Sequence, residues 1–250
     1  MAAFSPHTEF LTLGEDLSGY LAKPHGVPGI GVVVLMEAFG LNAFVKGVCE
    51  RFARAGYMAL APDIYHGDRF EYADRERAIA RANDVDDDVV MREVGAALDM
   101  LIAQGAREGR LAVMGFCMGG RLAFLANAVH GARLAASVAF YGGGIAPAVP
   151  RGKRKPLVDR VGDLKAPQLL VYGGRDASIA SDEHARIAKA LSDANKRYTM
   201  AVLPDAPHAF ATSDRESYHP AAADSIRLPD PADFFARHQV AKSSDIRRAA

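Results

Sequence analysis

The chain has 250 residues, half of them hydrophobic, so it can bury a core of the size that one α/β domain holds. Thirty basic and thirty acidic residues cancel to a formal net charge of zero, which argues against a nucleic-acid or anionic-membrane partner and favours a small molecule. Because the start of the chain lacks a secretory signal and its longest apolar run falls far short of the roughly 20 residues that cross a bilayer, we expect a soluble, cytoplasmic protein.

Short runs rich in Val, Ile, Leu and Met alternate with longer segments of helical period, a pattern typical of a mostly parallel sheet with helices on both faces. In chain order the pattern predicts strand 30–36, helix 43–55, strand 57–62, helix 84–104, strand 110–116, helix 118–129, strands 135–141 and 167–173, helix 181–194 and strand 198–203. We expect these elements to form a single α/β domain over 1–250, with its core at about 10–240 and a frayed tail at 242–250.

Two proline-bearing segments are expected to lie outside the sheet. Residues 147–167, which include the basic run Arg151–Lys155, are expected to form a solvated surface loop between two strands. Near the end of the chain, Pro229 and Pro231 should delay a final helix until about Ala232.

The most informative motif is Gly-Phe-Cys-Met-Gly-Gly at residues 115–120, between a predicted strand and a predicted helix. This is the pattern of a nucleophile elbow with Cys117 as the nucleophile, because Gly115 and Gly119 leave room for a strained turn. The helix that follows would direct N–H groups at the sulfur, which favours a thiolate and later an oxyanion. By itself, the motif fits a buried structural cysteine equally well.

Two further residues strengthen the nucleophile interpretation. Asp176 follows the strand at 167–173, and His208 follows the strand at 198–203. Groups beyond the carboxyl ends of parallel strands share one edge of the sheet, and the order nucleophile, acid, histidine is that of the α/β-hydrolase triad. We therefore expect an α/β-hydrolase fold in which His208 moves the proton and Asp176 orients its ring. A turn-capping aspartate and a surface histidine are the alternatives.

The other cysteine and histidines receive no catalytic role. Cys49 lies in an apolar helical pattern and is expected to fill the core. The histidines without a role are His7, His25, His66, His130, His184, His219 and His238. Neither a Cys-x-x-Cys nor a His-Glu-x-x-His spacing occurs, so we expect no metal, and acyl transfer by these side chains needs no cofactor.

Glu37 follows the strand at 30–36 and, by position alone, could be a surface acid or a helix cap. The sequence, however, resembles the dienelactone hydrolase (carboxymethylenebutenolidase-like) family over about 10–240. The motifs that carry the resemblance are Met-Glu-Ala-Phe-Gly-Leu-Asn at 36–42, Ala-Pro-Asp at 61–63, the cysteine elbow, Tyr-Gly-Gly at 141–143, Gly-Gly-Arg-Asp at 173–176 and Pro-His-Ala-Phe at 207–210. The resemblance implies a neutral resting thiol that passes its proton to Glu37, and an oxyanion hole made by the N–H groups of Ala38 and Met118.

The chain departs from this family at the positions that hold the substrate carboxylate. Thr212 stands four residues after His208, where the family's lactone hydrolases have an arginine, and Ala209 replaces a serine. Arg75 or Arg77 could match a second family arginine, with solvated helix charges as the alternative. Phe39 and Tyr141 are candidate pocket walls, with core packing as the alternative. The substrate is therefore expected to be a dienelactone-like ester or lactone, with a different ester or lactone, such as one without a carboxylate, as the alternative.

Other functions compete with this hydrolase. A non-enzymatic thiol sensor or ligand-binding module would use Cys117 for reversible oxidation. A glutamine amidotransferase requires His-x-Glu after the cysteine, and none occurs. A dinucleotide-binding fold requires Gly-x-Gly-x-x-Gly, which 115–120 lacks. The oligomeric state and the identity of the ester do not follow from the sequence.

Overall fold

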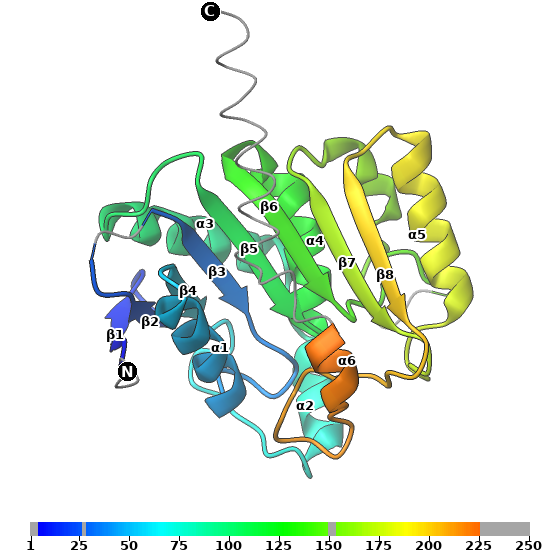
Figure 1. The fold of residues 1–250 in the computed structure, drawn as a ribbon, viewed down its shortest axis with the longest axis horizontal. Coiled ribbons are helices and arrows are strands. Elements are labelled where there is room, and N and C mark those ends of the chain that lie inside the picture. Colours follow the sequence, from blue (N-terminus) through cyan, green and yellow to red (C-terminus); the bar gives the residue numbers. More distant parts are fainter. Residues whose placement is uncertain (1–4, 27–28, 150–153, 226–250) are drawn as a thin grey trace, which may run out of the picture.

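The computed structural model of the chain describes residues 5–26, 29–149 and 154–225, and the side chains up to residue 223. Its centre is an eight-stranded sheet in the order β1-β2-β4-β3-β5-β6-β7-β8 (Figure 1). The strands are β1 (His7–Thr12), β2 (Ser18–Lys23), β3 (Gly31–Leu35), β4 (Met58–Pro62), β5 (Leu111–Phe116), β6 (Leu134–Phe140), β7 (Gln168–Gly173) and β8 (Tyr198–Leu203). β3 to β8 are parallel, whereas β1 and β2 form an antiparallel hairpin at one edge.

The helices cover both faces of the sheet. Figure 1 shows α1 in front of the sheet, with α3 and α4 behind it. The helices are α1 (Ala43–Arg54), α2 (Arg75–Asn83), α3 (Asp87–Ala103), α4 (Met118–His130), α5 (Ser181–Asp193) and α6 (Pro220–Ser225), with short 3₁₀ helices at Gly131–Arg133 (η1) and Val158–Asp163 (η2). Because every residue of β3, β4, β5, β6 and β7 is buried, these strands have the nearly continuous apolar runs that made them predictable.

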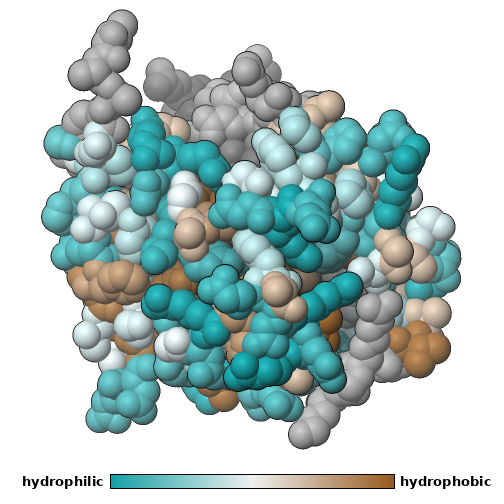
Figure 2. Space-filling view, turned by 90° about the horizontal axis from the view of Figure 1, so that it is seen from below, coloured by the Kyte–Doolittle hydropathy of each residue, from teal (hydrophilic) through white to brown (hydrophobic). Residues whose placement is uncertain are grey.

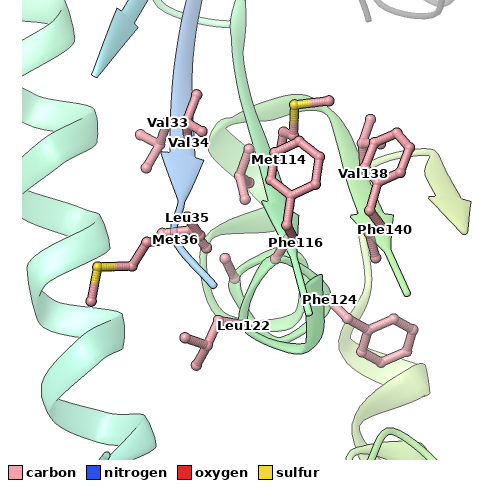
Figure 3. Packing of buried hydrophobic residues seen from close by; sticks show 14 of the residues in the cluster. Val33, Val34, Leu35, Met36, Met114, Phe116, Leu122, Phe124, Val138 and Phe140 are labelled. Atoms are coloured by element: carbon pink, nitrogen blue, oxygen red, sulfur yellow. The ribbon is translucent and has the colours of Figure 1, made fainter. Parts of the chain in front are cut away.

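Aromatic packing fixes the end of β5, where the cysteine turn begins. Phe116 lies between Phe44 of α1, at 5.0 Å between ring centroids, and Phe140 of β6, also at 5.0 Å. Figure 3 shows Phe116, Phe140 and Phe124 of α4 in this cluster. Such ring pairs contribute about 0.5–1.5 kcal/mol each beyond the area they bury. Cys117, the residue after Phe116, thus follows directly on a buried aromatic cluster of the core.

Several element boundaries differ from the sequence-based expectations. The predicted helix at 84–104 begins at Asp87, because Asp86 caps it by accepting the N–H groups of residues 88 and 89 at 2.9 and 3.0 Å. A short helix begins at Pro220, twelve residues before the predicted start at Ala232, because proline suits a first helical position and the His219 ring accepts the residue 222 N–H. The helix expected from Ala232 itself lies outside the described residues.

The expectation of a solvated loop at 147–167 is wrong for its second half. Leu157, Val161 and Leu164 are buried, and the N–H of Leu157 donates to the Ile145 carbonyl at 2.7 Å. Val161 of η2 and the two leucines that flank this helix anchor the segment against the domain. Of the basic run, only Arg154 and Lys155 lie in the described part.

Within the described ranges, no helix is long and apolar enough to span a membrane. In the same residues, no cluster of three or more His, Cys, Asp or Glu side chains could hold a metal ion.

Candidate active site

Cys117 occupies the tight turn between β5 and α4. Its backbone has φ +53° and ψ −114°, a conformation that costs about 1–3 kcal/mol for a residue with a side chain. Glycines make the turn possible: a Cβ on Gly115 would lie 2.0 Å from the Gly119 carbonyl oxygen, and a Cβ on Gly119 would lie 2.3 Å from the Leu35 carbonyl oxygen. The turn has the strained geometry that the Gly-x-Cys-x-Gly spacing predicts, and it holds the thiol at the carboxyl edge of the sheet.

Asp176 and His208 form a hydrogen-bonded chain that ends on this thiol. Asp176 follows β7 and His208 follows β8, so both lie beyond the carboxyl ends of strands, as Cys117 does. His208 Nε2 lies 3.2 Å from Cys117 Sγ, and His208 Nδ1 lies 2.6 Å from Asp176 Oδ2. The second Asp176 oxygen accepts the Ser178 N–H at 2.7 Å. The structure therefore brings together the three side chains that the sequence predicts to meet.

Interactions within this hydrogen-bonded chain lower the pKa of the Cys117 thiol and raise the pKa of the His208 imidazole. The surrounding protein shields Cys117 from water and so raises its thiol pKa, but the charge and hydrogen bond of His208 outweigh this effect and lower the pKa below its usual value. Burial lowers the pKa of His208, but the Cys117 charge and the Asp176 hydrogen bond raise it to about 10. The two groups titrate as a coupled pair. Both shifts act toward the thiolate form, and the neutral resting thiol that the family resemblance implies stays a prediction.

Glu37 is a buried carboxylate at the end of β3. Its side chain is 1% exposed; Oε1 accepts the Asn42 side-chain N–H at 3.4 Å, and Oε2 lies 3.9 Å from Arg215 Nη1. Oε2 has no hydrogen-bond partner among the described residues. Burial raises the Glu37 pKa, while the charge of Arg215 and the Tyr72 and Asn42 hydrogen bonds partly offset this rise. Glu37 can therefore accept a proton more readily than an exposed glutamate.

A cavity of about 260 Å³ opens beside Cys117 and His208. Figure 2 looks onto this edge of the molecule, where hydrophilic side chains cover most of the surface and hydrophobic atoms show between them. The cavity is lined by the predicted residues Ala38, Met118, Phe39, Tyr141 and Arg75, and also by Arg121, Arg154 and Arg215. The described lining contains four arginines and no aspartate or glutamate. Positively charged side chains therefore outnumber negatively charged ones in the described lining.

The amino-acid sequence matches the model of the dienelactone hydrolase family over residues 17–238. The chain belongs to this family. A Yersinia pestis protein named "Putative carboxymethylenebutenolidase" is 36% identical over 235 residues, which cover 91% of this chain and 86% of that protein. A Bradyrhizobium protein named "Probable 2-oxo-3-(5-oxofuran-2-ylidene)propanoate lactonase" is 33% identical over 219 residues, 86% of this chain and 87% of that one.

Solved structures agree with this membership. A structure described as a "Putative Dienelactone Hydrolase" from Klebsiella pneumoniae superposes with a TM-score of 0.85 at 32% identity, and the match covers 93% of this chain and 99% of that one. These matches confirm the predicted α/β-hydrolase fold. As a member of the dienelactone hydrolase family, the protein is a hydrolase that acts on esters or lactones, which argues against the non-enzymatic thiol sensor.

The sequence analysis did not identify Arg215, although its side chain lines the cavity of this dienelactone hydrolase. Thr212, the residue four after His208, is fully buried, and its hydroxyl lies 3.4 Å from that of Tyr141. Successive turns, in which the Thr212 N–H donates to Ala209 and the Arg215 N–H donates to Thr212, bring residue 215 back to the cavity. An arginine seven residues after the histidine, one turn beyond the family position at four residues, would have been the sequence signal for this cavity residue.

The candidate substrate-binding residues differ in where they lie. Arg75, at the start of α2, lines the cavity, whereas Arg77 pairs with Asp74 at 2.9 Å and is not part of the lining. Phe39 is mostly buried but reaches the cavity, and the Arg215 guanidinium lies 5.2 Å from its ring centroid. Tyr141 is fully buried behind His208, with 5.1 Å between their ring centroids. Packing and cavity-lining roles thus coincide for both aromatic residues.

The remaining candidates lie outside the cavity. Cys49 is fully buried and unpaired with Cys117, as the core-filling interpretation expects. Except for His208, the described histidines do not line the cavity, and His238 lies outside the described residues. His7 begins β1, a strand that the sequence pattern does not predict.

Proposed function

We propose that this dienelactone hydrolase family member cleaves its ester or lactone by covalent catalysis, with Cys117 as the nucleophile. One observation supports this proposal most directly. The Asp176 carboxylate, the His208 ring and the Cys117 sulfur form a continuous chain of contacts at 2.6 and 3.2 Å, and that chain ends on a strained turn at the mouth of a cavity. Asp176 would fix the tautomer and orientation of His208.

In the first half of the reaction, the Cys117 thiolate attacks the carbonyl carbon and the C=O electron pair moves to oxygen. The N–H groups of Ala38 and Met118, at the turns after β3 and β5, would stabilise this oxyanion. Each such donor contributes about 3–4 kcal/mol to transition-state stabilisation. The intermediate then expels the alkoxide, which takes a proton from the His208 imidazolium, and a thioester remains on Cys117.

In the second half, neutral His208 takes a proton from water and the resulting hydroxide attacks the thioester. Collapse of that intermediate releases the carboxylic acid and returns the thiolate, with the imidazolium restored beside it. Opening a lactone follows the same steps, but the alkoxide remains attached to the acyl group until the thioester is hydrolysed.

Glu37 would regulate the charge on Cys117. Its negative charge raises the thiol pKa, so protonation of Glu37 would stabilise the thiolate. A substrate anion that drew Arg215 away would raise the Glu37 pKa further and favour this proton uptake. Glu37 would thereby couple substrate binding to activation of the nucleophile.

The cavity lining supports an anionic substrate rather than the carboxylate-free ester considered from sequence. Arg75 and Arg215 would bind a carboxylate, and Phe39 and Tyr141 would form the apolar walls. The zero net charge of the chain supports a small-molecule partner rather than nucleic acid or a membrane surface.

The test is steady-state hydrolysis of a dienelactone and of p-nitrophenyl acetate by the wild type, Cys117→Ala and Cys117→Ser. We expect Cys117→Ala to lose nearly all activity toward both compounds, while far-ultraviolet circular dichroism stays unchanged. If Cys117→Ala retains most of the wild-type kcat/KM, the covalent mechanism is wrong.

A further inference from the structure

The four arginines that line the cavity are not equivalent. Arg121 is neutralised by Asp87 through two bonds of 2.7 and 2.8 Å, and it donates a third bond to the Lys155 carbonyl. Its side chain is 1% exposed, and although its Nε lacks a hydrogen-bond partner among the described residues, its charge is balanced by Asp87. Arg121 is therefore a structural group, and the cavity keeps three guanidiniums, those of Arg75, Arg154 and Arg215, that could bind a substrate anion.

Arg154 has an unsatisfied donor. Its Nη2 atom is buried and lacks a hydrogen-bond partner within the described part of the chain. Burial and the nearby charge of Arg121 lower its pKa, while Cys117 and Tyr65 act in the opposite direction, so a negative charge would stabilise the guanidinium. Buried donors are rarely left without a partner in folded proteins, and a ligand is one way to satisfy them.

Arg154 and Arg215 occupy different parts of the cavity wall. Arg215 lies 3.9 Å from Glu37 and against the rings of Phe39 and Tyr72. The titratable groups near Arg154 are those of Arg121, Tyr65, Asp87 and Cys117. The two guanidiniums thus have different neighbours within one cavity, which favours two anion-binding points over one shared point.

We propose that Arg154 forms a second anion subsite, and that the preferred substrate is an ester or lactone with two carboxylates, one bound by Arg215 and the other by Arg154. This inference rests on the proposed function, because it concerns the same cavity and the same reaction at Cys117. A substrate that spans the thiol would place its two charges on opposite sides of the reacting carbonyl.

Four chromogenic esters separate these charges. They are p-nitrophenyl acetate, which is neutral; p-nitrophenyl hydrogen glutarate, with a carboxylate on the acyl side; 5-acetoxy-2-nitrobenzoate, with a carboxylate on the leaving group; and the glutaryl ester of 5-hydroxy-2-nitrobenzoate, with both. We expect the doubly charged ester to have the highest kcat/KM in the wild type. In Arg154→Met, the kcat/KM for the doubly charged ester, divided by that for the neutral ester, should fall by about tenfold or more. Most of this fall should come from a higher KM for the doubly charged ester.

Two matched variants make this test specific. Arg154→Lys keeps the charge and should restore part of the lost ratio. Arg160→Met removes an exposed arginine of the same segment, one that pairs with Asp163 at 2.6 Å, and should leave the ratio at the wild-type value. The proposal is overturned if the wild type shows no preference for charged esters, or if Arg154→Met lowers kcat/KM for neutral and charged esters by the same factor. Failure of the cysteine mechanism would be distinct, because Cys117→Ala would then still hydrolyse the neutral ester.

Discussion

Glu37 Oε2 lies 3.9 Å from Nη1 of Arg215, a residue of the cavity wall, although the two residues are far apart in the sequence. The guanidinium also lies over Phe39 and Tyr72, at 5.2 and 5.4 Å from their ring centroids. This stacking holds the positive charge beside a carboxylate that is otherwise shielded from water. The charge state of Glu37 therefore depends on the position of the Arg215 guanidinium. In the proposed mechanism, an anionic substrate would change that position.

Arg215→Met should raise the Glu37 pKa, because burial already raises it and Arg215 is the largest opposing influence. A carboxylate with a higher pKa stays protonated to higher pH, so the limb of the pH–kcat/KM profile that reports Glu37 should move toward higher pH. Arg215→Lys should move it less. The profiles are measured with neutral p-nitrophenyl acetate. If the profile of Arg215→Met matches that of the wild type, Arg215 does not influence the pKa of Glu37.

Cys117 should react with iodoacetamide at pH values below its ordinary thiol pKa, because His208 lowers that pKa. Replacing His208 with alanine removes both lowering effects, so the rate of alkylation at neutral pH should fall severalfold. Cys49 serves as an internal control, because burial raises its thiol pKa and it is 0% exposed. Peptide mapping of the alkylated protein measures both sites, and equal reaction of Cys117 in the two proteins would contradict the ion-pair description.

Gly119→Ala should strongly destabilise the fold, because its Cβ would lie 2.3 Å from the Leu35 carbonyl oxygen and 2.6 Å from that of Met36. Both contacts are with backbone, so relief requires β3 and α4 to separate, and a loss of at least about 3 kcal/mol in the free energy of unfolding is expected. Gly162→Ala is the matched control, since a Cβ at residue 162 would meet no described atom within 4 Å and the change in stability should stay within about 1 kcal/mol. Urea unfolding measures both, and equal effects would refute the steric argument.

Asp87→Asn should cost about 3–5 kcal/mol of stability, because it leaves the buried Arg121 guanidinium without its counter-charge. Asp74→Asn breaks the exposed pair with Arg77 and should cost about 1 kcal/mol or less. The comparison is made by urea denaturation at constant pH and salt. A loss for Asp87→Asn no larger than that for Asp74→Asn would mean that Arg121 is satisfied in another way.

Most of the strands that followed from sequence are buried on both sides, although the partly exposed β8 was also predicted and β2 was missed with four of its six residues buried. β3 to β7 have continuous apolar runs because helices cover both of their faces, and the three triad candidates follow strand ends whose position in the sheet is set by topology. β1 escapes prediction because its residues are half exposed, with Phe10 at 54%, and α2 escapes it because that helix buries only Ala78 and Ala82. In both elements, few buried residues leave only a weak hydrophobic pattern in the sequence.

The arginines of the cavity could not be found in the same way. Arg215 reaches the site through a succession of tight turns, and Arg154 reaches it because apolar residues of the β6–β7 segment anchor that segment against the domain. Neither position is determined by a repeating pattern. A motif locates residues that follow a strand, whereas the side chains that select the substrate come from loops whose course depends on tertiary contacts.

The measurement that tests the central claim most directly is the mass of the protein during turnover. The protein is mixed with p-nitrophenyl acetate, quenched in acid within the first turnovers and analysed by electrospray mass spectrometry with peptide mapping. We expect one acetyl group on the Cys117 peptide, which disappears as the ester is exhausted and never forms in Cys117→Ala. Continued turnover by Cys117→Ala, or an acetyl group found only on another residue, would contradict covalent catalysis by Cys117.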